Sequence, residues 1–330
     1  MQFALNRRTA AAGLLGVAVA AVAGGCAALD IKQREWIFNP SKEDFRGYAG
    51  MPAGTQEFWL DVANGQTVPV RTEIPAQDGH PQWIHAWWMP AANPNAPALL
   101  YLHGARWNLT GSTWRTQKWR EAGFSVLAID YRGFGESEGD VPSEKGAYED
   151  ATAAWAWLKA KQPNARKRII YGHSLGGAVA IELATHVKPD EAAGLITEST
   201  FTSIADMTKT FKWGFLPVGF LITQRFDSED KIAKVALPKI FVHGTADRFV
   251  PPRMSDELYA AAQGQKLLIK VEGAGHSNVV WTDFDPVKNA ALALVTGGMH
   301  AVPPALNHPR ADVEAQTTAP PAGAQPALVR

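Results

Sequence analysis

Short apolar runs alternate with helical stretches through the middle of this chain of 330 residues. Each run is rich in aliphatic side chains, and in chain order they are Ala98–Leu102, Ser125–Ile129, Ile169–Tyr171, Gly194–Thr197, Lys239–Val242 and Leu267–Val271. The helical stretches lie between or after them, at Thr113–Glu121, Glu144–Lys161, Leu175–Val187, Pro252–Gln263 and Phe284–Val295. Near-continuous aliphatic strands that alternate with helices are typical of a parallel sheet covered on both faces. The pattern predicts an α/β fold with one doubly wound sheet.

Two earlier runs differ from these in character. Glu57–Val62 and Trp83–Met89 show partial alternation of polar and apolar residues between Gly, Pro and Asn. Such runs favour an antiparallel pair at the start of the sheet. Together with the six later runs they predict a mostly parallel sheet of about eight strands.

The pentapeptide Gly172-His173-Ser174-Leu175-Gly176 lies between the apolar run that ends at Tyr171 and a helical run of small residues. A Gly-x-Ser-x-Gly sequence in a strand–turn–helix setting presents its serine on a tight turn, where flanking glycines remove side-chain clashes. By itself the pentapeptide is weak support for a nucleophile. Its setting makes Ser174 the candidate nucleophile.

A serine hydroxyl needs a general base, and the base needs a third group that orients it. His276 follows the last predicted strand in a Gly-rich loop, and Asp247 follows the strand before it. The carboxyl ends of parallel strands meet at one edge of a sheet, so we expect Ser174, Asp247 and His276 to converge there. Asp227 and Asp230 are the alternatives for the acid, but they lie in a segment between two strands.

The other histidines are expected to be structural or solvated, with His103 and His243 bracing loops at strand exits. A tetrahedral oxyanion also needs backbone donors. The amide of Leu175, directly after the serine, and that of Ala105, in the loop after the first parallel strand, are the predicted oxyanion-hole donors.

Several further motifs follow the strands in a particular order. They are His103-Gly104, Asp130-Tyr131-Arg132-Gly133-Phe134-Gly135-Glu136-Ser137, the Ser174 pentapeptide, His243-Gly244-Thr245-Ala246-Asp247 and Gly275-His276. In this order the chain from about residue 58 to 295 resembles the α/β-hydrolase superfamily, and in particular the α/β-hydrolase-domain-containing branch with acyl-protein thioesterases and lipid hydrolases. The resemblance implies an α/β-hydrolase fold, a serine hydrolase activity, and structural roles for Asp130 and Asp150. Arg106-Trp107 departs from that branch, which often has small residues or Asn there.

The substrate pocket is less well marked. Of the 12 tryptophans, Trp107 beside the predicted oxyanion loop and Trp281 just after His276 are candidate substrate contacts. The apolar stretch at residues 211–222 falls between the runs Gly194–Thr197 and Lys239–Val242, where this fold commonly carries a cap, here expected at about 201–236. A buried helix pair is the alternative for this stretch. An apolar cap favours substrates with an acyl chain.

Both ends of the chain are expected to lie outside the fold. Arg7-Arg8 precedes an apolar run that ends in Ala23-Gly24-Gly25-Cys26, which resembles a bacterial lipoprotein signal peptide over residues 1–25 with Cys26 acylated. An N-terminal extension at 26–55, a hydrolase domain at 56–300 and a disordered Pro/Ala-rich tail at 301–330 follow. This predicts a protein anchored by lipid in the bacterial envelope, at the outer membrane facing the periplasm. An ordinary cleaved signal peptide and a secreted or periplasmic soluble protein are the alternative.

Composition excludes several other classes. Lys and Arg total 32 and Asp and Glu total 32, so no excess charge draws the chain to nucleic acid. Its 1 cysteine rules out a disulfide framework or a multi-thiolate metal site, and the expected chemistry needs neither metal nor organic cofactor. The predicted activity is hydrolysis of carboxylic esters, including thioesters and lipid esters, on a small-molecule or lipid substrate. The alternatives are an amide or peptide hydrolase and a non-catalytic envelope lipoprotein.

Overall fold

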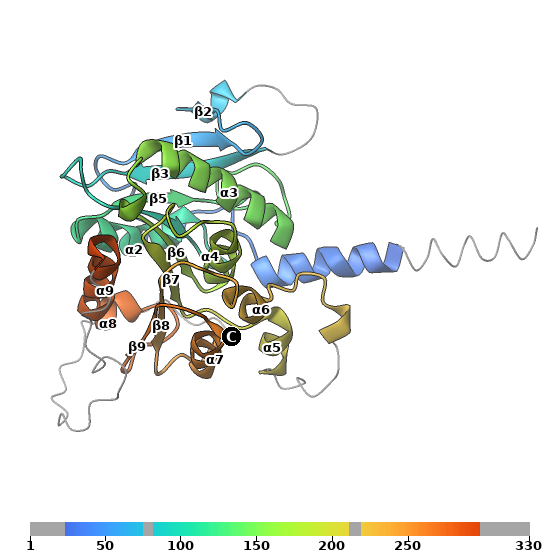
Figure 1. Cartoon of the computed structure of the whole chain (residues 1–330). Coiled ribbons are helices and arrows are strands. Elements are labelled where there is room, and N and C mark those ends of the chain that lie inside the picture. Colours follow the sequence, from blue (N-terminus) through green and yellow to red (C-terminus); the bar gives the residue numbers. More distant parts are fainter. Residues whose placement is uncertain (1–23, 75–81, 211–218, 298–330) are drawn as a thin grey trace, which may run out of the picture.

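The computed structural model describes residues 24–74, 82–210 and 219–297. These contain one nine-stranded sheet in the order β2-β1-β3-β5-β4-β6-β7-β8-β9 (Figure 1). The strands are β1 (Gln56–Asp61), β2 (Thr67–Val68), β3 (Trp83–Met89), β4 (Ala98–Leu102), β5 (Ser125–Ile129), β6 (Arg168–His173), β7 (Gly194–Glu198), β8 (Lys239–Gly244) and β9 (Lys266–Val271). Strands β4 to β9 pair in parallel, whereas β1, β2 and β3 are antiparallel additions at one edge.

The predicted doubly wound, mostly parallel sheet is confirmed, including its antiparallel opening pair. In that pair Gln56 lies opposite Trp88 and Asp61 lies opposite Trp83. The strand beyond the eight expected is β2, whose 2 residues pair with Trp59 and Leu60 of β1. A strand this short leaves no periodic pattern in a sequence, so only the pairing reveals it.

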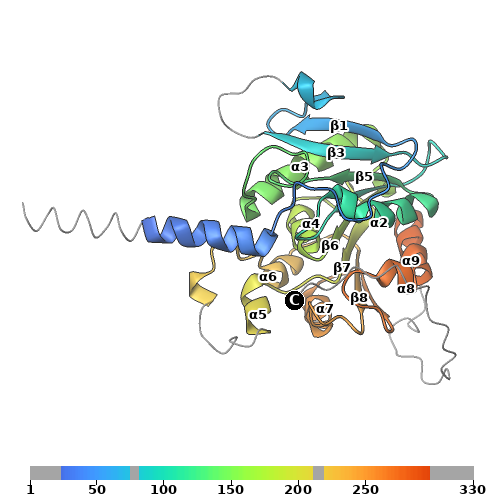
Figure 2. The same ribbon diagram turned by 180° about the vertical axis from the view of Figure 1, so that it is seen from behind.

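Helices cover both faces of the sheet, as Figures 1 and 2 show from opposite sides. One face carries α2 (Leu109–Glu121), α8 (Val279–Thr282) and α9 (Asp285–Thr296), and the other carries α3 (Glu144–Lys161), α4 (Leu175–Thr185), α6 (Ser228–Ile232) and α7 (Arg253–Ala261). Along β4, Leu100 and Leu102 join one core, while Leu99 and Tyr101 join the other. Both sets are fully buried, which explains why the sequence of this strand is apolar throughout.

Helix α2 begins at Leu109, earlier than the predicted Thr113. Asn108 caps it, because its side-chain oxygen accepts a hydrogen bond from the Thr110 amide at 3.1 Å. The first turn contains Gly111, a weak helix former, and for this reason the sequence pattern hid the start of the helix. A Cβ at Gly111 would lie 2.7 Å from the Cβ of Trp107, so the glycine makes room for that side chain.

Residues 24–38 form a helix that projects from the body of the molecule (Figure 1). Its last residue, Phe38, is fully buried and packs edge-on against Phe134 and Phe226, at centroid distances of 6.3 and 5.7 Å. The carbonyl of Phe38 accepts a hydrogen bond from the Arg106 amide at 2.8 Å. The segment that the sequence marked as an extension therefore packs into the core and against the loop that follows β4.

The segment between β7 and β8, where we predicted a cap, contains α5 (Ile204–Lys209), the 3-10 turn η3 (Gly219–Leu221) and α6. Two further 3-10 turns are η1 (Arg71–Glu73) and η2 (Ala165–Lys167). The predicted signal peptide up to residue 23, the central part of the apolar cap stretch at 211–218 and the tail at 301–330 lie outside the described residues. None of the helices in the described ranges has the length and apolarity needed to span a membrane.

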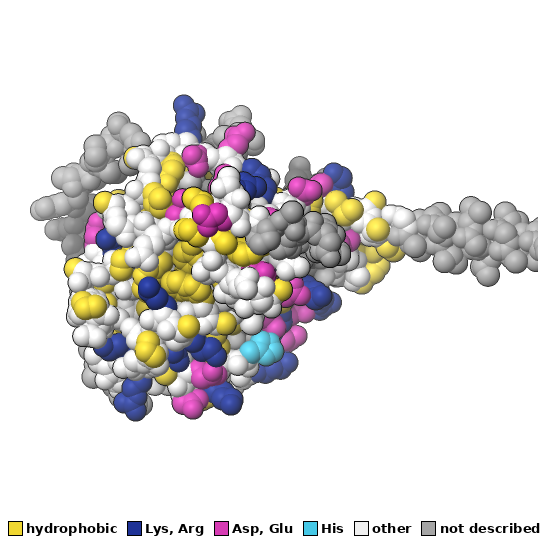
Figure 3. All heavy atoms as spheres, turned by 90° about the horizontal axis from the view of Figure 1, so that it is seen from above, with side chains coloured by type: hydrophobic (Ala, Val, Ile, Leu, Met, Phe, Trp, Pro, Cys, Tyr) yellow, Lys and Arg dark blue, Asp and Glu magenta, His cyan; other side chains and the backbone are white. Residues whose placement is uncertain are grey.

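On the face seen from above, side chains of both charge signs are interspersed around a central group of hydrophobic side chains (Figure 3). This mixture agrees with the balance of 32 basic and 32 acidic residues. The face in this view therefore lacks the one-sign field expected of a polyanion-binding surface.

Candidate active site

Ser174 occupies the turn between β6 and α4, with φ 54° and ψ −119°. This left-handed conformation is strained for a residue with a side chain. The glycines on either side allow it, because a Cβ on Gly172 would lie 2.1 Å from the Gly176 oxygen and one on Gly176 would lie 2.0 Å from the Leu102 oxygen. The turn is held further by a 2.8 Å hydrogen bond from the Ser174 amide to the carbonyl of Glu198.

The structure brings His276 and Asp247 to this serine from two other strand exits. His276 Nε2 lies 3.0 Å from Ser174 Oγ, and His276 Nδ1 lies 2.8 Å from Asp247 Oδ2. In the tautomer that donates its Nδ1 proton to the carboxylate, Nε2 accepts the hydroxyl hydrogen of Ser174. The hydrogen-bonded series Ser174–His276–Asp247 therefore has the geometry that activates a serine by general-base catalysis.

Asp247 is buried and richly hydrogen-bonded. Its Oδ1 accepts from the amides of Phe249 at 2.8 Å and Val250 at 2.9 Å, and its Oδ2 also accepts from His243 Nε2 at 3.1 Å. Burial opposes ionisation, but hydrogen bonds from His243 and His276 prevail and hold the pKa of Asp247 well below its ordinary value. A fixed negative charge therefore faces the imidazole of His276.

The alternative acids lie elsewhere. Asp227 precedes α6 and pairs with Arg225 at 2.7 Å, and Asp230 lies within α6. His243 behaves as expected for a residue that braces a loop, since its Nδ1 bonds Ser255 Oγ at 2.5 Å behind Asp247.

The loop after β4 runs close to the serine. A Cβ on Gly104 would lie 3.3 Å from Ser174 Cβ and 3.2 Å from His173 Nδ1, so only glycine fits there without displacement. Within the described part of the chain the Ala105 amide has no hydrogen-bond acceptor. Leu175 is the first residue of α4, and its amide has no acceptor within the helix. Both predicted donors thus have free N–H groups next to the turn.

The two tryptophans proposed as substrate contacts lie further out. Trp107 is 47% exposed and packs edge-on against Phe45, and Trp281 is 61% exposed and stacks on Trp114. Among the described residues, neither tryptophan ring packs against the ring of His276. Phe249, which we did not single out, does so, because its ring lies 5.0 Å from that of His276. Its position two residues after Asp247 is the signal that could have drawn attention to it.

The guanidinium of Arg106 lies 5.4 Å from the centre of the Phe249 ring. Arg106 has φ 80°, so this loop, like the Ser174 turn, holds a non-glycine residue in the left-handed region. The sequence departure noted at Arg106-Trp107 thus lies next to the site, because Phe249, which Arg106 contacts, packs against His276.

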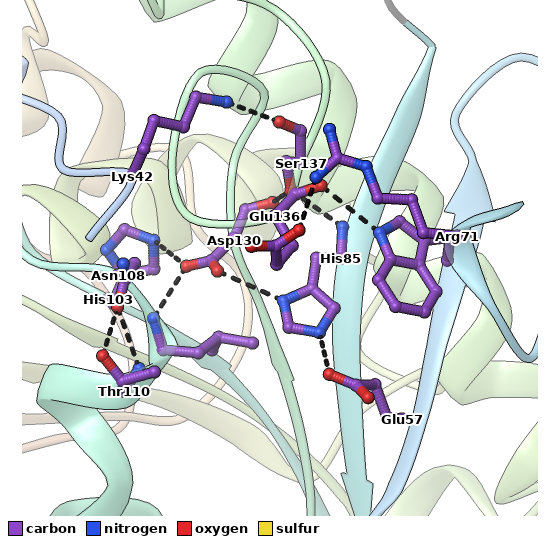
Figure 4. Close-up of polar contacts among 12 residues, drawn as sticks. Lys42, Glu57, Arg71, His85, His103, Asn108, Thr110, Asp130, Glu136 and Ser137 are labelled. Atoms are coloured by element: carbon purple, nitrogen blue, oxygen red, sulfur yellow. Dashed lines mark hydrogen bonds and ion pairs between the residues drawn. The ribbon is translucent and has the colours of Figure 1, made fainter. Parts of the chain in front are cut away.

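A second buried polar cluster lies behind the loop that follows β4 (Figure 4). Asp130 accepts from the Leu109 amide at 2.8 Å and lies 3.4 Å from both His103 and His85. His85 Nε2 lies 2.7 Å from Glu57, on the neighbouring strand. Burial disfavours the charged form of His85, yet the hydrogen bonds and charges of Asp130 and Glu57 prevail and raise its pKa to about 9.

This cluster supports the structural role expected for Asp130, because it ties α2 and the β4 loop to the opening strands. Asp150 has a similar role on the other side, where it accepts from the amide and Nε of Arg132 at 2.8 and 2.6 Å. No group of three or more His, Cys, Asp or Glu side chains in the described ranges is arranged to hold a metal ion.

Comparisons with known proteins place this site in context. A family model described as serine aminopeptidase, S33, matches residues 93–226. The chain is 35% identical over 217 residues to the uncharacterized protein Rv2307c of Mycobacterium tuberculosis, covering 65% of this chain and 73% of the relative. It is 30% identical over 239 residues to the lysophosphatidylserine lipase ABHD12 of Danio rerio, covering 65% of this chain and 60% of the relative.

Solved structures share the fold at low sequence identity. The α/β hydrolase GrgF from Penicillium sp. sh18 superposes with a TM-score of 0.56 and 17% identity, covering 74% of this chain and 99% of that one. The Pyrococcus furiosus esterase Pf2001 superposes with a TM-score of 0.53 and 20% identity, covering 66% and 86%. At these identities the likeness extends to the fold alone.

Proposed function

The chain belongs to the α/β-hydrolase superfamily, and on this basis we propose that it is a serine hydrolase that cleaves carboxylic esters through an acyl-enzyme on Ser174. The observation that carries the proposal is the hydrogen-bonded chain from Ser174 Oγ to His276 at 3.0 Å and from His276 to Asp247 at 2.8 Å. It joins groups from three strand exits, where doubly wound sheets form their active sites.

In the first half-reaction Ser174 Oγ attacks the ester carbonyl carbon while His276 Nε2 takes the hydroxyl proton. The negative charge on the carbonyl oxygen is stabilised by the amides of Ala105 and Leu175. Asp247 stabilises the imidazolium that forms. The bond to the leaving oxygen then breaks, and His276 returns the proton to that oxygen, which departs as an alcohol.

In the second half-reaction a water molecule replaces the alcohol. His276 removes its proton, the resulting hydroxide attacks the acyl carbon, and the same two amides stabilise the new oxyanion. Ser174 leaves with the proton that His276 returns to it, and the carboxylic acid is released. His276 carries each proton that moves, so the two half-reactions regenerate the free enzyme with Ser174 protonated and His276 neutral.

One relative is named as a lysophosphatidylserine lipase, and this favours esters with an acyl chain for this protein also. In the segment expected to form a cap, Phe220 and Leu221 of η3 are 81% and 45% exposed. Apolar side chains there suit a substrate with a hydrocarbon tail, whether a lipid ester or a thioester.

An amide or peptide hydrolase is the second candidate, favoured by the description of the family model as a serine aminopeptidase. The same Ser–His–Asp chemistry cleaves esters and amides, so the site geometry alone does not separate them.

A fluorophosphonate probe, which labels activated serines, tests the proposal directly. We expect wild-type protein to be labelled and to hydrolyse aryl esters, Ser174→Ala to lose both properties, and the matched serine variant Ser143→Ala to keep both. Equal labelling of wild type and Ser174→Ala would contradict the proposal. A series of aryl esters and thioesters of increasing chain length, set beside aminoacyl anilides, then separates the ester from the amide hydrolase.

We also propose that the protein is held at the envelope membrane by an acyl group on Cys26. Cys26 is exposed on the helix of residues 24–38, which projects from the body of the molecule (Figures 1 and 2). The small residues before it and the apolar run before those support processing as a lipoprotein.

A further inference from the structure

A buried ion pair lies directly behind the candidate active site. Arg115 of α2 and Glu198 at the end of β7 have side chains only 3% and 1% exposed, and Arg115 Nη2 donates to Glu198 Oε1 at 2.9 Å. The Tyr171 hydroxyl donates to the other oxygen, Glu198 Oε2. Because desolvation offsets the attraction of such a pair, burial of both charges is weak support for a stabilising role. Its neighbours indicate a different role.

Glu198 also contacts the nucleophile, through its backbone and not its carboxylate, since its carbonyl oxygen accepts from the Ser174 amide at 2.8 Å. The side chain of Arg115 contacts the segment that carries the base, since Arg115 Nη2 also donates to the carbonyl of Ser277 at 3.0 Å. Ser277 is the residue after His276. Through its partner Glu198, which adjoins the Ser174 amide, Arg115 therefore anchors the His276 segment to the strand end that holds the nucleophile.

The preceding carbonyl of the same loop is held as well. His173, the residue before the serine, lies with its Nε2 3.0 Å from the carbonyl oxygen of His276. A carbonyl oxygen can only accept, so His173 Nε2 carries the hydrogen of this bond. Burial, together with the charge of Arg115, holds the pKa of His173 well below its ordinary value and disfavours a charged ring. Two successive carbonyls are thus fixed by donors beneath the serine.

The loop needs such support because its own structure is slight. It contains Gly273, with φ 71°, and Gly275, and no regular element spans it between β9 and α8. Its internal restraints are a 2.6 Å hydrogen bond from the Gly275 amide to Asn278 Oδ1 and a 3.3 Å bond from the Ala274 amide to the Val271 carbonyl. Its first residues are also tied to the loop after β8, because the Gly273 amide donates to Thr245 Oγ1 at 2.9 Å and the Ala274 carbonyl accepts from the Ala246 amide at 2.9 Å. A glycine-containing loop of this kind has many accessible conformations, so its position depends on contacts from outside.

We propose that Arg115, held in place by Glu198, is a positioning residue that fixes the loop carrying His276 within reach of Ser174. This inference rests on the proposed function. Loss of the guanidinium leaves the Ser277 carbonyl without this donor and lets the imidazole drift from Ser174 Oγ. Displacement of a catalytic group by about 1 Å lowers the rate of the chemical step by up to about 100-fold while affecting substrate binding much less.

The test compares Arg115→Met with Arg168→Met in the full-length protein. Arg168 is a matched control because it is also a buried arginine, 6% exposed, that donates to backbone carbonyls. Its partners are Glu191 at 2.9 Å and Gln162 at 2.8 Å, at the amino end of β6, which is the opposite end from Ser174. Steady-state kcat and KM are measured on one soluble aryl ester, with kcat expressed per serine titrated to completion with a fluorophosphonate.

We expect Arg115→Met to lower kcat per titrated site about 10- to 100-fold with little change in KM. Arg168→Met should lower stability but leave kcat per site unchanged. Arg115→Lys, which keeps the charge but not the planar fork, should fall between wild type and Arg115→Met, and it serves as the test if Arg115→Met does not fold.

Wild-type kcat per site in both Arg115 variants, or a change confined to KM, would overturn the inference. Failure of the proposed function has a different signature, namely that wild type and Ser174→Ala label and hydrolyse alike. If wild type depends on Ser174 but not on Arg115, the proposed function stands and only the positioning role is lost.

Discussion

At the scale of single residues, the candidate site combines strain with dense hydrogen bonding. Ser174 at φ 54° and Arg106 at φ 80° hold conformations of a kind that costs about 1–3 kcal/mol each. Asp247 is held by four donors, two backbone amides and two imidazoles. Backbone strain persists only where surrounding contacts leave the residue no alternative conformation. Such contacts hold the turn at Ser174, whose amide donates to Glu198, and the loop at Arg106, whose amide donates to Phe38.

His85 makes a testable contribution to stability. Its folded pKa of about 9 lies above the ordinary value of about 6.5, so its contribution is fully present below pH 6.5 and is lost as pH rises through 9. We expect the free energy of unfolding of wild type, measured by denaturant titration, to fall by at most about 3 kcal/mol more across this range than that of His85→Gln. Equal pH dependence in the two proteins would contradict a charged His85.

At the scale of elements, the turn from β6 into α4 depends on close packing of backbones. Residues 176–178 are Gly-Gly-Ala, and a Cβ on Gly177 would lie 1.7 Å from Thr200 Oγ1. Small residues let the first turn of α4 lie directly against the exits of β4 and β7. The chain therefore presents Ser174 at the sheet edge because α4 approaches the sheet so closely.

Gly172→Ala tests this packing. Its Cβ would lie 2.1 Å from the carbonyl oxygen of Gly176, so α4 must shift, and we expect a loss of about 3 kcal/mol in the free energy of unfolding together with loss of probe labelling. Gly219→Ala is the control, because the nearest atom to its Cβ is 3.9 Å away. Denaturant unfolding and fluorophosphonate labelling of both variants provide the readout, and a stable, fully labelled Gly172→Ala protein would contradict the argument.

At the scale of the whole molecule, the N-terminal segment links the proposed anchor to the site. Phe38 is buried in the core and its carbonyl holds the Arg106 amide, while Cys26 lies on the same helix roughly 18 Å away along its axis. Gln33 of this helix also bonds the Leu221 carbonyl at 2.7 Å and the Thr223 amide at 2.9 Å, in the cap segment. An acyl group on Cys26 would therefore hold this helix, and with it the cap segment that Gln33 contacts, near the membrane surface.

Cys26→Ser tests the anchor. We expect wild type to sediment with membranes and to take up a labelled fatty acid, and Cys26→Ser to do neither while keeping its esterase activity on soluble aryl esters. Continued sedimentation of Cys26→Ser with membranes would count against acylation at Cys26. Wild type that is soluble and unlabelled would favour the ordinary signal peptide instead.

The sequence by itself determined the fold class, because buried parallel strands need continuous aliphatic runs and those runs are visible at 98–102, 125–129 and 239–242. It also singled out Ser174, Asp247 and His276, since each stands next to a strand exit. It did not reveal β2 or the start of α2, whose residues carry little pattern of their own.

Only the tertiary structure decided which groups meet. Nothing in the sequence spacing of Arg115, Glu198 and Ser277 indicates that their groups are in contact. The sequence also carries no sign that Phe249 packs against His276 or that Phe38 is buried in the core. Contacts between distant segments depend on how the layers pack, and a local pattern records only which face of an element is buried. For this reason the candidate catalytic side chains could be named from the sequence, whereas the residues that hold them in place could not.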